Sequence, residues 1–167
     1  GGMAFGTDPV MVEKVVNAVK KEADKPLIVK LSPNVTDITE TAKAAVAGGA
    51  DGLSLINTLT GMKIDIYKRK AVLDRKIGGM SGPAVKPVAV RMVYQVCKAV
   101  DVPVIGMGGI SNAEDAIEFI MAGATGVSIG TANFINPTAT VDTIEGIEEY
   151  MKKYNVSDLS EIRGIID

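Results

Sequence analysis

Four short apolar runs alternate with helical patterns along this chain, and this alternation limits the fold more than any other feature. The runs span residues 27–31, 53–57, 102–106 and 127–130. Each is rich in Val, Ile or Leu on both faces, which is typical of strands covered by helices in a parallel sheet. We therefore expect an α/β fold with four parallel strands.

Amphipathic helical patterns fill the intervals around these runs. They span Asp8 to Ala23, Asp37 to Ala47, Ala84 to Val100, Asn112 to Ala122 and Ile144 to Tyr154. Asp37 with Glu40, and Ser111 with Glu114, have the spacing of capping boxes. Strands that alternate with helices of this length indicate βα units.

A weak internal repeat favours a barrel. The segment Ala47–Leu55 resembles Ala122–Ile129, and each follows a strand and its helix. Repetition of βα pairs is typical of barrels, although a doubly wound open sheet can show it too. A complete (β/α)₈ barrel needs eight units and about 250 residues. This chain has 167 residues, so the sequence predicts about half of a barrel.

The segment Thr58 to Pro83 is too long for a simple connection. It contains two short β-like runs, Ile64–Ile66 and Ala71–Leu73, on either side of the basic run Lys68–Lys70. We expect a small β-insertion over the catalytic face. The alternative is a disordered surface loop.

Composition excludes several classes of function. The net charge of -2 provides no basic face for nucleic acid, and no apolar run approaches the ~18 residues of a membrane span. Histidine is absent, which removes Ser-His-Asp, Cys-His and His-metal mechanisms within this chain. Cys97 is the only cysteine, so no intramolecular disulfide forms and a reducing cytoplasm is expected. Its place within a helical pattern indicates a core residue rather than a nucleophile.

Two glycine-containing turns follow consecutive predicted strands. Gly106–Ser111 leads into a helix, and Gly130–Ala132 follows the next strand. In barrels, the loops after the last two strands often bind phosphate, because glycines let backbone N–H groups approach the anion. One such turn alone is usually structural, but the pair predicts a phosphate site that includes Gly108, Gly109, Gly130 and Thr131.

Polar residues at other strand ends are further candidates. Lys30 lies in an otherwise apolar strand, where a buried cation needs a partner. It is either a cation at the catalytic end or a lysine that extends to solvent from the barrel bottom. Asn57 and Thr58 end the second strand, where Asn suits an amide or imide edge or forms an Asx turn. Glycines in Gly78–Pro83 indicate close approach to a flat ligand.

Five segments together resemble dihydroorotate dehydrogenase. They are residues 27–33, 53–58, 77–87 (IGGMSGPAVKP), 102–110 (VPVIGMGGI) and 126–134 (GVSIGTANF). The opening residues 1–9 also resemble this family, and the similarity is greatest to its class 1, type B form, the catalytic subunit of the NAD-linked enzyme. The resemblance implies the C-terminal half of a TIM (β/α)₈ barrel, with residues 1–167 as a single partial domain. Such a barrel holds FMN and oxidises (S)-dihydroorotate to orotate in de novo pyrimidine synthesis.

The resemblance also implies roles for individual residues. Cofactor-binding residues would be Lys30, Ile56, Gly82, Gly108, Gly109, Gly130 and Thr131. Lys30 would contact the N1/O2 side of the flavin ring, Ile56 would pack beside the ring, and Gly82 would contact FMN through its backbone. The other four would bind the FMN phosphate. Asn57 and Thr58 would bind orotate.

No catalytic residue is expected within this chain. The family's base is a cysteine in a Ser-Cys-Pro-Asn motif that this sequence lacks, and Cys97 does not match it. We therefore expect this chain to be a fragment of an active parent enzyme. The fragment by itself would not turn over dihydroorotate. The implied partners are dihydroorotate or orotate, a second parent subunit in a homodimer, and an electron-transfer subunit with FAD and a 2Fe-2S cluster. Alternatives are the FMN domain of dihydropyrimidine dehydrogenase and a non-catalytic phosphate-binding half-barrel.

Overall fold

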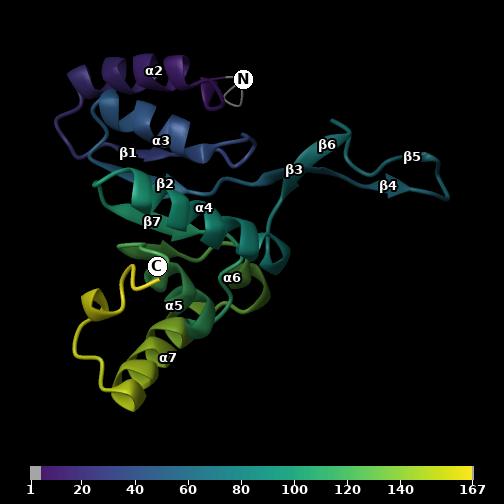
Figure 1. Ribbon diagram of the computed structural model, residues 1–167. Helices are drawn as coiled ribbons and strands as arrows, with labels where there is room; N and C mark the ends of the chain where they lie inside the picture. The colour runs from purple at the N-terminus through teal and green to yellow at the C-terminus, as the bar shows by residue number, and fades with distance from the viewer. Residues whose placement is uncertain (1–4, 167) are drawn as a thin grey trace.

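A central sheet of four parallel strands organises the chain (Figure 1). The computed structural model describes residues 5–166. The strand order is β1 (Ile28–Lys30), β2 (Gly52–Leu55), β7 (Val104–Met107) and β8 (Gly126–Ser128). All three pairings are parallel, so the carboxyl ends of the strands meet at one edge of the sheet. The four predicted strands are confirmed, with bounds shifted by two residues or fewer.

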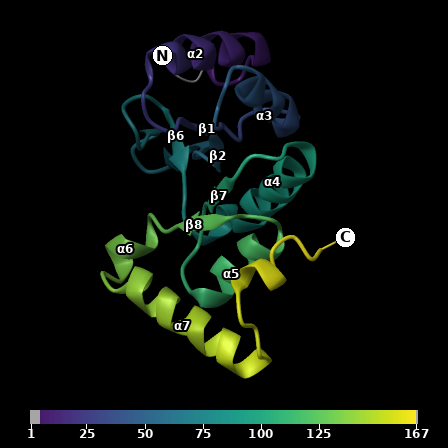
Figure 2. The ribbon, with the colours of Figure 1, turned by 90° about the vertical axis from the view of Figure 1, so that its left-hand side faces the viewer.

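The longer helices lie along one side of this sheet. They are α2 (Pro9–Glu22), α3 (Ile38–Ala47), α4 (Lys86–Ala99), α5 (Ala113–Met121) and α7 (Ala139–Tyr154). Short helical turns are η1 (Pro83–Val85), α6 (Ala132–Ile135) and η2 (Leu159–Glu161). Helices α3, α4 and α5 occupy the same side of the strands, while α2 packs on α3 and α7 packs on α5 (Figure 2). The one-sided cover matches a segment of a barrel wall.

All five predicted helices form, but α7 begins earlier than expected. Its first residue is Ala139 rather than Ile144. Ala139 and Thr143 are buried, and the Thr143 hydroxyl donates to the Ala139 carbonyl at 2.7 Å. The first turn of α7 is therefore held by packing and by a side-chain bond that the periodic pattern does not include.

Only half of the predicted capping box forms at the start of α3. The Asp37 carboxylate accepts from the Thr39 N–H at 2.9 Å, and its hydrogen bonds with Thr39 lower the Asp37 pKa. Glu40 forms an ion pair with Lys43 instead of returning to the cap. The N-cap was predicted correctly and its reciprocal partner was not.

The internal repeat corresponds to two helix ends of the same geometry. After α3, the N–H of Gly49 donates to Val46 and that of Ala50 donates to Ala45. After α5, Gly123 and Ala124 bond to Ile120 and Phe119 in the same way. Gly49 and Gly123 have φ angles of 102° and 118°, as a Schellman motif requires. These four bonds explain why both segments contain a glycine just before a strand.

Burial differs between central and edge strands. Every residue of β2 is buried, and Leu53 and Leu55 are fully so. In β1, Ile28 is 51% exposed, and no residue of β8 is fully buried. The expectation that all four strands are covered on both faces is therefore correct only for β2. The inner strand β7 alternates between buried and half-buried residues, and β1 and β8 lie at the edges of the sheet.

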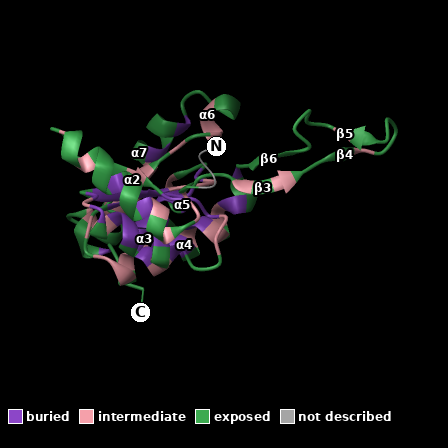
Figure 3. Cartoon of the chain, turned by 90° about the horizontal axis from the view of Figure 1, so that it is seen from above, coloured by how far each residue is buried: buried purple, intermediate pink, exposed green. Residues whose placement is uncertain are grey.

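The long connection between β2 and α4 is a β-arm, as predicted. Strands β3 (Leu59–Met62) and β6 (Ile77–Met80) pair antiparallel, and β4 (Ile64–Asp65) pairs with β5 (Lys70–Ala71) farther out. The distal arm extends away from the sheet instead of lying over its strand ends, and it is largely exposed (Figure 3). The expected cover over the catalytic face is therefore wrong for the distal arm.

Within residues 5–166, no helix combines the length and apolar character needed to cross a bilayer.

Candidate phosphate-binding site

A cavity of about 270 Å³ opens at the carboxyl ends of the central strands. Its wall contains all nine residues singled out by the sequence: Lys30, Ile56, Asn57, Thr58, Gly82, Gly108, Gly109, Gly130 and Thr131. It also contains residues to which the sequence analysis gave no individual role: Ser81, Pro83, Met107, Ile110, Ser111, Ser128, Ala132 and Ile135. The sheet therefore brings the predicted residues together in one place.

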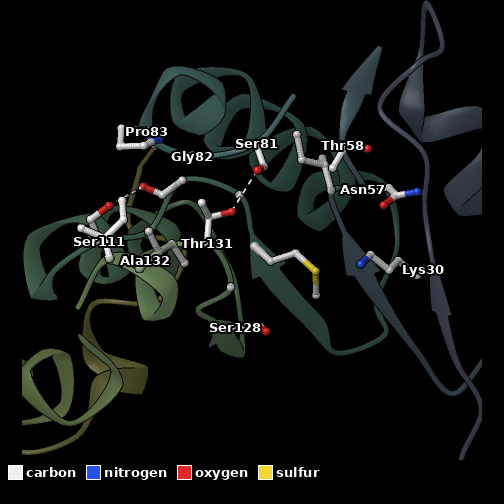
Figure 4. A pocket seen from close by; sticks show the side chains of 17 residues that line it. Lys30, Asn57, Thr58, Ser81, Gly82, Pro83, Ser111, Ser128, Thr131 and Ala132 are labelled. Atoms are coloured by element: carbon white, nitrogen blue, oxygen red, sulfur yellow. Dashed lines mark hydrogen bonds between the residues drawn. The ribbon is translucent and has the colours of Figure 1, made fainter. Parts of the chain in front are cut away.

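The cavity has two chemically different ends (Figure 4). Lys30, Asn57 and Thr58 lie together at one end, beside the ends of β1 and β2. Gly82 and Ser111 lie at the other end, and Thr131 lies between the two groups. One end thus offers a cation with amide and hydroxyl groups, and the other offers mainly backbone.

Unpaired backbone donors gather in the cavity wall. Among the residues that the structure describes, the lining N–H groups that donate to no protein acceptor include those of Gly109, Ile110, Gly130, Thr131 and Ala132. They come from the two turns after β7 and β8. Unpaired N–H groups on neighbouring turns suit a phosphate, which accepts several hydrogen bonds at once.

The first turn requires glycine for reasons within the protein. Gly108 and Gly109 have φ angles of 128° and 80°, which residues with a Cβ rarely adopt. A Cβ at Gly109 would lie 2.7 Å from the carbonyl oxygen of Gly82, and one at Gly108 would lie 3.2 Å from Ile56 Cγ1. These glycines therefore shape the turn as well as exposing its backbone.

The second turn is different, because Gly130 has space around it. No protein atom lies within 4 Å of a Cβ built at Gly130. Beside it, the Thr131 hydroxyl donates to the Ser81 hydroxyl at 2.9 Å, which links the turn after β8 to the segment before η1. Ser81 lies within the Gly78–Pro83 run, but the sequence-based expectation for this run rested on its glycines and not on Ser81. Gly78 and Gly79 instead belong to β6, and only Gly82 of these glycines reaches the cavity.

Lys30 is exposed rather than buried, which corrects one expectation. It is the last residue of the edge strand β1, where no further strand of the described chain covers it. It lines the cavity and forms no ion pair with any described residue. Its place at the carboxyl end of β1 excludes the barrel-bottom alternative and leaves the cation available to a ligand.

Asn57 and Thr58 are also exposed at the cavity. The Asn57 side chain forms no hydrogen bond with another described residue, so the Asx-turn alternative is not supported. The neighbouring Asn34 orders this segment, because its amide donates to the Thr58 carbonyl at 3.1 Å.

The start of α5 is held by a carboxylate and a lysine. The N-cap is Asn112, whose side chain accepts from the Asp115 N–H at 2.9 Å. The Ser111 N–H donates to Asp115 at 2.8 Å, so the predicted box of Ser111 with Glu114 is wrong by one residue. Lys86 donates to Asp115 at 2.6 Å, and the pKa of Lys86 is raised chiefly by this bond.

Cys97 behaves as the core residue that was predicted. It packs against the main hydrophobic cluster on α4, away from the cavity lining. Desolvation raises the pKa of its thiol to about 11, so the thiol stays protonated and is a poor nucleophile near neutral pH.

The parallel sheet, its one-sided helical cover and the cavity at its strand ends define an α/β-barrel protein with a candidate phosphate site. The model of the dihydroorotate dehydrogenase family matches residues 1–151 of this chain, and the chain belongs to that family. The family is in general flavin-dependent.

Two bacterial relatives are similar over nearly the whole chain. The dihydroorotate dehydrogenase B (NAD(+)) catalytic subunit of Alkaliphilus metalliredigens is 71% identical over 164 residues, which cover 98% of this chain and 54% of the relative. The subunit of the same name from Lachnoclostridium phytofermentans is 67% identical over 166 residues, which cover 99% of this chain and 55% of the relative. The chain therefore spans about half the length of these relatives, and their names imply a partner subunit for them.

A solved structure supports the fold. The dihydroorotate dehydrogenase of Eimeria tenella, solved in complex with ferulenol, superposes with a TM-score of 0.78 at 21% sequence identity. The match covers 95% of this chain and 48% of that protein. The prediction of half a TIM barrel is confirmed.

Proposed function

We propose that this chain supplies the FMN-binding half of a dihydroorotate dehydrogenase, which oxidises (S)-dihydroorotate to orotate in de novo pyrimidine synthesis. The main support is the set of unpaired N–H groups in the turns after two consecutive strands, since the residues of both turns line one cavity. Family membership and the names of the relatives support the choice of reaction. In this proposal, residues 1–167 form one partial domain, the C-terminal half of the barrel.

The residues present fit the phosphate of FMN. The turns that contain Gly108, Gly109, Gly130 and Thr131 would hold the phosphate through backbone N–H groups and the Thr131 hydroxyl. Gly82 adds backbone to the same end of the cavity. Bound FMN supplies the two-electron acceptor of the reaction.

The opposite end of the cavity would meet the flavin ring and the substrate. Lys30 places a positive charge where it would stabilise negative charge on the ligand. Ile56 provides an apolar surface for the ring, and Asn57 and Thr58 offer donors and acceptors to dihydroorotate. No residue of this chain is assigned as the general base.

The relatives' names support a partner subunit. Their description as NAD(+)-linked catalytic subunits supports an electron-transfer partner, which would carry FAD and a 2Fe-2S cluster. The homodimer and the cytoplasmic location stay predictions.

Two alternatives are distinguished by flavin binding together with the effect of orotate on the flavin spectrum. A dihydropyrimidine dehydrogenase-like FMN domain would also bind FMN, but orotate would not perturb its flavin spectrum. A non-catalytic phosphate-binding half-barrel would bind inorganic phosphate without a preference for flavin.

The test is a titration of the purified chain with FMN and with riboflavin, followed by flavin fluorescence. Riboflavin has the same ring system but lacks the phosphate. We expect FMN to bind about 100-fold more tightly, because charge-assisted hydrogen bonds each contribute about 1.5–3 kcal/mol. Equal affinity for both flavins would contradict the proposed site. A change in the visible spectrum on addition of orotate to the FMN complex supports the assigned reaction over both alternatives.

A further inference from the structure

Lys86 lies beside Gly109 of the first turn and joins two helices. It is the first residue of α4, and its ammonium group donates to Asp115 and to Glu118 of α5, each at 2.6 Å. The Asp115 side chain is 13% exposed, whereas that of Glu118 is 50% exposed. The contact with Asp115 is therefore the buried one, and it lies on the side of α5 where the helix begins.

Asp115 connects this lysine to the first phosphate-binding turn. One carboxylate oxygen accepts from Lys86, and the other accepts from the N–H of Ser111 at 2.8 Å. Ser111 ends the turn that contains Gly108 and Gly109 and lines the cavity. A single carboxylate thus fixes the last residue of the turn.

The backbone at the start of α4 presses against the same turn from the other side. A Cβ built at Gly109 would lie 3.0 Å from the backbone nitrogen of Lys86 and 2.9 Å from its Cβ. The turn is therefore held between the backbone of Lys86 and the carboxylate that the Lys86 side chain binds.

The charges at this place oppose anion binding unless they are balanced. Asp115 puts a nearly buried negative charge at the end of a turn whose residues line the cavity. A negative charge in a medium of low polarity repels a nearby phosphate and needs a partner. Lys86 is the only cation that bonds to Asp115 among the described residues.

We propose that Lys86 is a positioning residue of the phosphate site, which neutralises Asp115 and keeps the Gly108–Ser111 turn open to a phosphate. The inference rests on the proposed FMN site and adds a residue that does not touch the ligand. It predicts that Lys86 controls the preference for a phosphorylated flavin more than the affinity for the flavin ring.

The experiment compares Kd values for FMN and riboflavin in Lys86→Met, Lys86→Arg and Glu118→Gln. Met keeps the apolar stem and removes the charge, and we expect it to lower the preference for FMN about 10- to 100-fold through repulsion and misplacement of the turn. Riboflavin affinity should change by less than about threefold, since that ligand carries no charge to be repelled. Lys86→Arg should keep most of the preference. Glu118→Gln is the matched control, because it removes the other partner of Lys86 and leaves Asp115 neutralised.

A double variant tests the link to Asp115 and covers the case in which Lys86→Met is too unstable to assay. In Lys86→Met/Asp115→Asn, the nearly buried charge of Asp115 is removed, and the Glu118 carboxylate that loses its lysine partner is half exposed to solvent. The amide introduced in place of the Asp115 carboxylate still carries an oxygen that accepts from Ser111. We expect the double variant to recover most of the preference for FMN. An unchanged preference in Lys86→Met, or a double variant no better than the single one, would overturn the inference. If the unsubstituted chain shows no preference for FMN, the proposed function itself fails.

Discussion

At Gly130 the protein has room for a side chain, whereas a bound phosphate would not leave that room. No protein atom lies within 4 Å of a Cβ placed there, and its φ angle is not in the left-handed region. We predict that Gly130→Ala folds with unchanged stability, within about 0.5 kcal/mol. The new methyl group should still weaken FMN binding about tenfold or more, because it lies where the phosphate approaches the backbone.

Gly126→Ala provides the matched control. Gly126 also has no atom within 4 Å of a built Cβ, but it lies in β8 and does not line the cavity. The FMN affinity and the unfolding free energy of the Gly126→Ala variant should match those of the unsubstituted chain. Unchanged FMN affinity in Gly130→Ala would place the phosphate elsewhere.

Cys97 gives a prediction with a definite pH dependence. Because burial raises the thiol pKa from its ordinary value near 9 to about 11, the folded chain holds the thiol proton more tightly than the unfolded chain. The associated stability is fully present below pH 9 and declines as the pH rises toward 11. At pH 8 the thiolate fraction should be about 100-fold lower than in the unfolded chain. A disulfide reagent should therefore react about 100-fold more slowly with native protein than with urea-denatured protein. Similar rates in both states would show that the thiol is not desolvated.

The location of a residue at the cavity could be predicted where its neighbours in sequence determine its place. Gly108, Gly109, Gly130 and Thr131 follow strands, and parallel strands bring such turns together. Lys30 could not be assigned as exposed, because its burial depends on which strand lies at the edge of the sheet. Ser81 was missed because its partner, Thr131, is 50 positions away in sequence.

At the scale of the element, the paired helix ends are the most informative feature. Gly123 has a φ angle of 118°, and a Cβ there would lie 2.7 Å from the Cβ of Cys97 on α4. We predict that Gly123→Ala destabilises the chain by about 1–3 kcal/mol, since both the backbone strain and the contact with α4 must be relieved.

Urea unfolding followed by circular dichroism measures this effect, with Gly126→Ala as the neutral control. A loss below about 0.5 kcal/mol in Gly123→Ala would mean that the helix end tolerates a side chain. FMN binding should persist in this variant at low temperature, because Gly123 lies outside the cavity wall.

Helices and strands were predictable from periodicity, and their ends were not. The five amphipathic patterns and four apolar runs all correspond to elements. The predicted N-cap of α5 was Ser111, but the observed N-cap is Asn112, because its side chain accepts from the Asp115 N–H while Asp115 accepts from the Ser111 N–H. The direction of the β-arm was not predictable either, since it follows from the pairing of β3 with β6.

At the scale of the whole molecule, half a barrel suffices to form the cavity that we propose as the phosphate site. Two consecutive strands, β7 and β8, supply both turns, and β1 and β2 supply the opposite end of the cavity. The site is therefore local to one four-stranded sheet. Phosphate recognition should be measurable in the 167-residue chain itself.

The most direct test of this account is a ¹H–¹⁵N NMR titration of the chain with FMN. A chain of 17.4 kDa is small enough for the backbone N–H signals to be followed individually. We predict that the largest shifts occur at Gly109, Ile110, Gly130 and Thr131, and that riboflavin leaves these signals nearly unchanged. Shifts confined to other segments, or the same response to both flavins, would contradict the claim that the two turns bind one phosphate.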